Sequence, residues 1–106
     1  MKKGDIILVP FPYTDLSGTK NRPALVLIKS IHDVTVCFIT TQLASQEDFD
    51  IIITPSAENG IKKKSIIRLR KITTLDLNLV LGKIGNLSDT DLFEVDQSLK
   101  KMLRLE

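Results

Sequence analysis

The chain has 106 residues, of which 42% are hydrophobic and 26% charged, and its formal net charge is +2 at pH 7. This length suits one domain with a single core, and no apolar run approaches the ~20 residues that a membrane span needs. The single cysteine, Cys37, excludes an internal disulfide, and its apolar neighbours favour a buried thiol over a nucleophile. Because no secretory signal is visible at the N-terminus, we expect a cytoplasmic protein.

The first predicted strand covers residues 6–9 and is stopped by Pro10 and Pro12. The segment 11–21 that follows lacks hydrophobic periodicity and contains Pro, Asp, Ser and Gly, which predicts a loop. Tyr13 on this loop could stack on a nucleic-acid base or cover the core, and the sequence leaves both interpretations open.

A long apolar strand is predicted over residues 22–30, with Arg22 at its entrance. Pro23 forbids the α region to the residue before it, so the Arg22 backbone is extended and its side chain leaves the strand end on a fixed path. The run Ala-Leu-Val-Leu-Ile at 24–28 is continuous rather than alternating, which indicates a strand covered on both faces. From this stretch alone, a solvent-facing strand end is the simpler interpretation of Arg22.

A tight turn at 31–33 connects this strand to a third one over 34–40, and the two form a hairpin. The third strand ends in Thr40 and Thr41, so both hydroxyls should lie at the same rim of the sheet as Arg22. One guanidinium and two hydroxyls could hold an oxyanion there. A polar strand end that satisfies its own backbone is the alternative.

Further on, short strands are predicted at 51–54, 65–72 and 83–85, with a turn at Asn59-Gly60. Six basic residues and no acid fall within ten positions: Lys62, Lys63, Lys64, Arg68, Arg70 and Lys71. Such a strip is either a solvated face or a phosphate-binding surface.

The clearest helix begins at Ser88, which offers an N-cap hydroxyl, and an apolar stripe follows at three- and four-residue steps: Leu92, Val95, Leu99 and Met102. We assign it no chemistry, because the pattern is that of a helix packed on a sheet. The whole chain, residues 1–106, therefore predicts one mainly β domain, a small twisted barrel or open sheet closed by a C-terminal α-helix.

Several common kinds of functional site are excluded because the sequence lacks their motifs. The chain has no Walker loop, no dinucleotide glycine fingerprint and no HExxH. His32 and Cys37 are single residues of their types and cannot build a tetrahedral zinc site, and nothing near His32 resembles a nucleophile elbow. We therefore expect a mechanism that needs no metal and no cofactor.

Five segments in chain order resemble the successive signatures of the MazF/PemK family, the toxins of bacterial type II toxin–antitoxin systems: Lys3-Gly4-Asp5-Ile6-Ile7-Leu8, Asn21-Arg22-Pro23-Ala24-Leu25-Val26-Leu27, Ile39-Thr40-Thr41-Gln42, Lys64-Ser65-Ile66-Ile67-Arg68-Leu69 and Thr74-Leu75-Asp76. The resemblance implies an SH3-like barrel, a homodimer and a growth-inhibiting mRNA interferase that a cognate antitoxin inhibits. Such an enzyme is a sequence-specific endoribonuclease that cleaves single-stranded mRNA without metal, through attack by the 2′-hydroxyl that only RNA has.

By matching position, the resemblance makes Arg22 the catalytic arginine and Thr40 the catalytic threonine. Since arginine keeps its proton, Arg22 suits a clamp on the phosphorane oxygens or a proton donor to the leaving 5′-oxygen. His32 could take the 2′-proton by its pKa, but we expect it at the other end of the hairpin. RNA contacts are expected from four residues: Tyr13, Lys20, Thr41 and Arg68. The chain departs from the family at Arg70, where an acid is common, and at Thr73, where an arginine is common, which leaves the preferred RNA sequence open.

Two other functions compete with a nuclease. CcdB-like toxins share the barrel and poison DNA gyrase by binding alone, in which case Arg22 and Thr40 would be dispensable. A binding module without toxicity is the third possibility.

Overall fold

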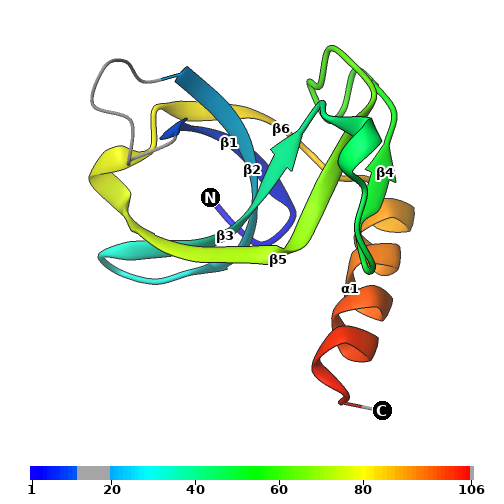
Figure 1. Cartoon of the computed structure of the whole chain (residues 1–106). Coiled ribbons are helices and arrows are strands. Elements are labelled where there is room, and N and C mark those ends of the chain that lie inside the picture. The colour runs from blue at the N-terminus through cyan, green and yellow to red at the C-terminus, as the bar shows by residue number, and fades with distance from the viewer. Residues whose placement is uncertain (12–19, 106) are drawn as a thin grey trace.

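The computed structural model describes residues 1–11 and 20–105 (Figure 1). Six strands, two short 3-10 turns and one α-helix follow one another along the chain: β1 (Asp5–Phe11), β2 (Lys20–Lys29), β3 (Asp33–Thr40), η1 (Leu43–Ser45), β4 (Ile51–Ile53), β5 (Ser65–Asp76), η2 (Leu77–Leu79), β6 (Gly82–Asn86) and α1 (Asp89–Leu103). Each predicted strand and the helix are present, but their ends differ from the predicted ones. Strand β2 begins at Lys20, so the prediction of a loop over 11–21 was wrong for its last two residues.

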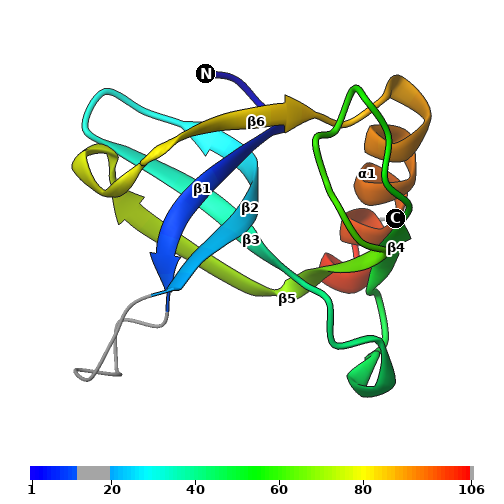
Figure 2. The ribbon, with the colours of Figure 1, turned by 90° about the horizontal axis from the view of Figure 1, so that it is seen from above.

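All strands pair antiparallel in one sheet, in the order β4-β5-β3-β2-β1-β6. The sheet curls into a half-barrel, and α1 lies beside it next to β4 (Figures 1 and 2). The long strand β5 is irregular: Cys37 pairs with Ile72 but Ile39 pairs with Ile67, so a single β3 residue faces residues 68–71. Such an irregularity bends a strand and re-aims its side chains, and it is common beside active sites.

Strand β2 is buried on both faces over Ala24, Leu25 and Val26 only. The prediction for the end of the apolar run was wrong, because Leu27 is partly buried and Ile28 is 59% exposed. Ala24 and Val26 belong to a core inside the curl, together with Val9 and Val36. Leu25 points to the other face, into a second core that includes Ile6, Cys37, Ile67 and Val95 of the helix. Fully burying an aliphatic side chain stabilises a fold by roughly 1.5–3 kcal/mol, so these two cores hold β2 firmly in its register.

The helix begins and ends as its sequence indicates. The Ser88 hydroxyl accepts a hydrogen bond from the Asp91 N–H, and Val95 on the apolar stripe is fully buried. At its C-terminal end, Arg104 adopts the left-handed conformation and its N–H bonds the last-turn carbonyls. No helix among the described residues is long and apolar enough to cross a membrane.

The prediction for β1 was wrong at its C-terminal end, because the strand continues past Pro10 to Phe11. Strand β6 pairs only as far as Leu8, so beyond that residue β2 is the one strand among the described residues that pairs with β1. A proline is tolerated there because an edge position does not require its missing N–H. Strand β5 likewise runs to Asp76 rather than ending at residue 72.

The loop before β5 packs directly on β6. Asn59 is buried and its side chain bonds the main chain of three loop residues: Thr54, Ser56 and Ile61. Gly60, at φ +69°, lies against the Ile84 carbonyl, and Gly85 lies against the main chain of Glu58 and Asn59, so neither position has space for a Cβ. Gly82 on the same strand has open space around it.

We expect Gly85→Ala to lower the free energy of unfolding by about 1–3 kcal/mol, because the added methyl group must push apart two backbone segments. Gly82→Ala is the matched control on the same strand and should change it by less than about 0.5 kcal/mol. Urea denaturation followed by circular dichroism measures both. Equal stabilities of the two variants would contradict the close contact.

Candidate active site

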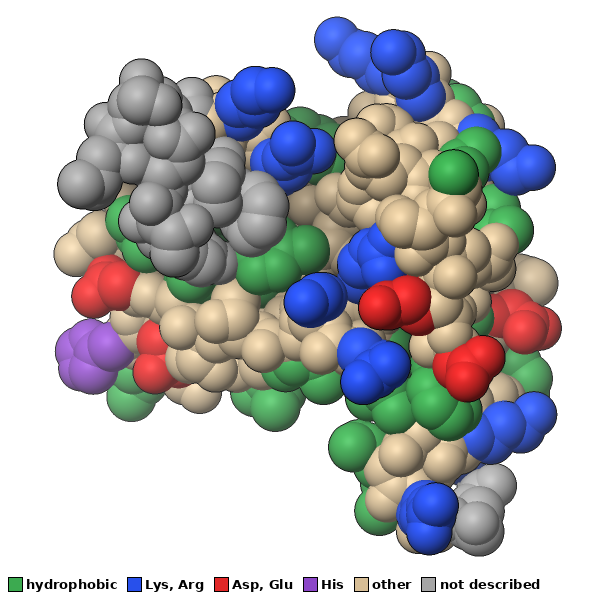
Figure 3. All heavy atoms as spheres, viewed as in Figure 1, with side chains coloured by type: hydrophobic (Ala, Val, Ile, Leu, Met, Phe, Trp, Pro, Cys, Tyr) green, Lys and Arg blue, Asp and Glu red, His purple; other side chains and the backbone are tan. Residues whose placement is uncertain are grey.

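A cleft of about 440 Å³ opens where β2, β3 and β5 meet. Nine residues line it: Arg22, Phe38, Ile39, Thr40, Gln42, Arg68, Lys71, Ile72 and Thr73. The cleft is thus lined by both residues predicted to be catalytic. Strand β5 contributes two residues from its irregular stretch, Arg68 and Lys71, and the two residues that follow, Ile72 and Thr73. Lys and Arg side chains gather around the hollowed middle of the face shown in Figure 3.

The register of the hairpin explains why Arg22 and Thr40 share this cleft. Ala24 pairs with Phe38, and continuing this antiparallel register by two residues brings Arg22 opposite Thr40. Residues two apart in a strand point to the same face, so both side chains lie on the side of Ala24 and Phe38. The expected meeting of a guanidinium and a hydroxyl at one rim agrees with this arrangement.

The Thr40 hydroxyl is held by its own strand end. Its Oγ1 accepts a hydrogen bond of 3.1 Å from the Gln42 main-chain N–H. A threonine hydroxyl has one donor hydrogen and two acceptor lone pairs, so this bond leaves the O–H group able to donate. Thr40 is half-buried and lines the cleft.

Thr41 does not join Arg22 in this cleft, which corrects the expectation that two hydroxyls converge there. Consecutive side chains of an extended segment point to opposite sides. Thr41 lines a second cleft of about 380 Å³, whose walls include Pro23 and Ile61 and whose basic residues are Lys62 and Lys63. Because Pro23 and Thr41 directly follow Arg22 and Thr40, the two clefts lie on opposite sides of the same two strand ends.

The other expected RNA contacts are placed differently. Lys20 is exposed at the start of β2 and is not among the residues that line either cleft. Arg68 lines the first cleft, but its side chain is only 13% exposed and is paired with Glu47 and Asp50 of the same chain. Tyr13 lies outside the described residues.

The basic strip divides between the two clefts, since Lys71 lines the first while Lys62 and Lys63 line the second. Sequence analysis did not single out Phe38, Gln42 or Lys71 as individual site residues. Phe38 could have been predicted from the sequence, because a residue two positions before Thr40 in the same strand must point to the same side of the sheet as Thr40.

Two reactive side chains lie away from this site. His32 is exposed in the turn between β2 and β3, at the opposite end of β3 from Thr40, as expected. Cys37 is fully buried, and burial raises the pKa of its thiol to about 12. Within residues 1–11 and 20–105, no group of three or more His, Cys, Asp or Glu side chains could hold a metal ion.

A family model described as PemK-like, MazF-like toxin of type II toxin–antitoxin systems matches residues 2–103. Similar solved structures include the Mycobacterium tuberculosis toxin MazF-mt6, with 20% identity, a TM-score of 0.75 and coverage of 96% of this chain and 98% of that one. MazF from Deinococcus radiodurans has 19% identity and a TM-score of 0.74, covering 97% and 96%. A mycobacterial endoribonuclease in complex with its cognate antitoxin has 17% identity and a TM-score of 0.72, covering 97% and 92%. No curated protein sequence matches.

We expect Cys37 to resist alkylation in the folded protein, because a thiol with a pKa of about 12 is thiolate in only about one molecule in 10⁴ at pH 8. Mass spectrometry after treatment with iodoacetamide at that pH should show no adduct, whereas the same treatment in concentrated guanidinium chloride should give one adduct per chain. Rapid labelling of the native protein would contradict the burial of this residue.

Proposed function

Because the chain belongs to the PemK-like, MazF-like toxins of type II toxin–antitoxin systems, we propose that it is an endoribonuclease that cleaves single-stranded mRNA. The observation that carries this proposal is the shared cleft of Arg22 and Thr40. A permanent cation and a hydroxyl donor, supplied by neighbouring strands, are suited to grip the two free oxygens of one phosphodiester.

In the proposed reaction, the ribose 2′-hydroxyl loses its proton to water and its oxygen attacks the adjacent phosphorus, while the bond from phosphorus to the 5′-oxygen breaks and that oxygen takes up a proton. The products are a 2′,3′-cyclic phosphate and a 5′-hydroxyl end. Negative charge grows on the phosphoryl oxygens as the new bond forms, so Arg22 lowers the barrier by neutralising it, and the Thr40 O–H donates to the same group. Each positioned donor of this kind is worth ~3–4 kcal/mol of transition-state stabilisation.

The second cleft supports a path for the flanking nucleotide. Its apolar walls suit a base, and Lys62 and Lys63 can neutralise the next phosphate. We propose Thr41, in the same cleft, and Lys20, at the start of β2, as further RNA contacts, and Tyr13 by resemblance. Thr73 lines the first cleft at a position where the family often has an arginine, which favours an RNA preference different from that of such relatives.

We further propose that the enzyme works as a homodimer in the cytoplasm, where its mRNA substrate is, and that a cognate antitoxin inhibits it. The support for the antitoxin is the family itself together with the neighbour that was solved with its own antitoxin.

We expect the purified protein to cut single-stranded RNA in excess EDTA, and Arg22→Ala and Thr40→Val each to lower kcat/KM by at least about 100-fold. Substituting a 2′-O-methyl group at the cut site should block cleavage, because the nucleophile is then absent. Gel electrophoresis measures the rates, and mass spectrometry identifies the cyclic phosphate. Activity that disappears in EDTA would contradict the metal-independent mechanism.

Lys29→Ala is a matched control for Arg22→Ala, since it removes a cation from the other end of the same strand. It should leave cleavage unchanged, and thermal unfolding of all variants should stay cooperative. In cells, growth arrest by the wild type that persists in Arg22→Ala would favour a gyrase-binding toxin of the CcdB kind over a nuclease.

A further inference from the structure

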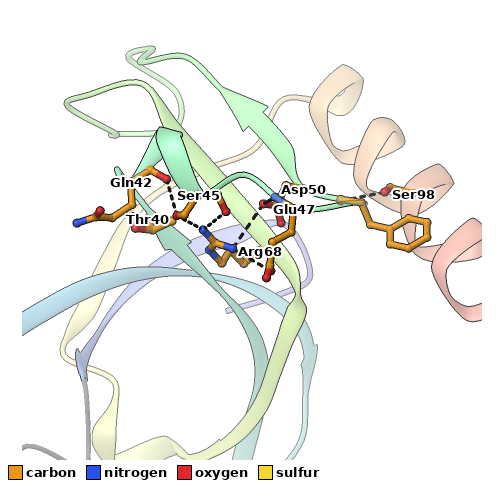
Figure 4. Close-up of polar contacts among 8 residues, drawn as sticks. Thr40, Gln42, Ser45, Glu47, Asp50, Arg68 and Ser98 are labelled. Carbon is orange, nitrogen blue, oxygen red and sulfur yellow. Dashed lines mark hydrogen bonds and ion pairs between the residues drawn. The ribbon is translucent and has the colours of Figure 1, made fainter.

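The guanidinium of Arg68 is directed into the segment 42–50 of its own chain (Figure 4). Its Nη1 donates to Glu47 Oε1 over 2.9 Å and lies 3.7 Å from Asp50 Oδ2. Its Nη2 donates to the Ser45 carbonyl oxygen over 2.8 Å and to Ser45 Oγ. Both terminal nitrogens are therefore used inside the protein, although Arg68 borders the first cleft.

The two acids fix Arg68 in this position. The Asp50 side chain is completely buried, and its Oδ2 also accepts a 2.7 Å hydrogen bond from the Glu47 N–H. A buried carboxylate is costly without a nearby cation, so the pair with Arg68 must persist whatever occupies the cleft. A phosphate that bound Arg68 directly would have to compete with this buried charge.

From Arg68, hydrogen bonds lead to the Thr40 hydroxyl (Figure 4). Ser45 Oγ accepts from Arg68 and donates to the Gln42 carbonyl oxygen over 3.0 Å. The Gln42 N–H in turn donates to Thr40 Oγ1 over 3.1 Å. The Gln42 carbonyl and N–H belong to two different peptide groups, so what passes through this residue is the position of its main chain, which Ser45 holds on one side and which in turn holds Thr40 on the other.

The last hydrogen bond of this series, from the Gln42 N–H to Thr40 Oγ1, determines what the Thr40 hydroxyl can do. With one lone pair of Oγ1 taken by the Gln42 N–H, the hydroxyl proton is kept away from that direction and is left to donate elsewhere. The phosphate oxygens of RNA accept hydrogen bonds and do not donate them. A hydroxyl whose proton is directed away from Gln42 meets this need more often than a freely rotating one.

We propose that Arg68 is a positioning residue, which acts through Ser45 and the Gln42 main chain to hold the Thr40 hydroxyl as a donor toward the phosphate. This inference rests on the proposed function, since Thr40 is its point of action in cleavage. This positioning role takes the place of the direct RNA contact that the sequence analysis expected of Arg68. The carboxylates of Glu47 and Asp50 belong to the same device, because they hold the guanidinium in place.

Ser45→Ala tests the proposal with little risk to folding, because Ser45 is exposed and Arg68 keeps its two acids. We expect kcat to fall about tenfold with KM unchanged, since a misplaced donor weakens the transition state and not substrate binding. Ser98→Ala is the matched control, because the Ser98 hydroxyl donates to the Phe49 carbonyl oxygen at the other end of the same segment and does not contact the chain of bonds. It should leave kcat unchanged.

Arg68→Lys separates positioning from RNA binding. A lysine keeps the charge beside Asp50 but lacks the two-pronged donor, so kcat should fall as in Ser45→Ala while the salt dependence of KM stays that of the wild type. In a Thr40→Val background, Ser45→Ala should have no further effect. A raised KM with a weaker salt dependence in Arg68→Lys, or an additive effect of Ser45→Ala on Thr40→Val, would overturn the proposal.

A structural measurement keeps this test independent of nuclease activity. Amide hydrogen exchange of Gln42, followed by NMR, should be about tenfold faster in Ser45→Ala than in the wild type and unchanged in Ser98→Ala, because only the former loosens the Gln42 main chain. If the wild type fails to cut RNA, the proposed function fails while this measurement still tests the positioning. Unchanged exchange of Gln42 in Ser45→Ala would overturn the positioning even in an active nuclease.

Discussion

The double burial of β2 is the constraint from which the geometry of the site follows. Its residues alternate between two apolar cores, and it is paired with β1 on one side and β3 on the other. A slip of one residue would turn Leu25 and Val26 to the wrong cores and move Arg22 to the other face of the sheet. Apolar side chains that never touch a substrate thus determine which hydroxyl stands beside Arg22.

Local rules account for the parts of the structure that the sequence predicts. The residue before Pro23 must be extended, the hairpin must bring the ends of β2 and β3 together, and Ser88 must begin a helix. Each of these inferences needs only neighbouring residues or one turn. For the same reason Arg22 and Thr40 could be paired before any coordinates, while Thr41 was grouped with them only because strand alternation was not applied to it.

The rest depends on contacts between distant segments, to which no periodicity points. Arg68 and Glu47 are 21 positions apart, and the sequence around Arg68 indicates only a basic strand. The irregular stretch 68–71, which aims β5 at the cleft, leaves no recognisable signature either. Pro10 predicts the end of β1, and the strand continues because β6 stops pairing before it, which the sequence does not reveal. The solved structures that share this fold are only 17–20% identical to the chain. This low identity is expected, because many different apolar sequences can fill cores of the same shape.

Pro10 has a consequence for how other polypeptides approach the molecule. Beyond Leu8, none of the described strands pairs with the outer side of β1, and at such an edge an extended peptide can add itself to a sheet by β-augmentation. Proline withholds a donor that such a pairing needs, so this edge discourages both self-association into fibrils and capture of foreign strands. A protein that blocks the neighbouring cleft must therefore recognise side chains, and cannot do so merely by extending the sheet at this edge.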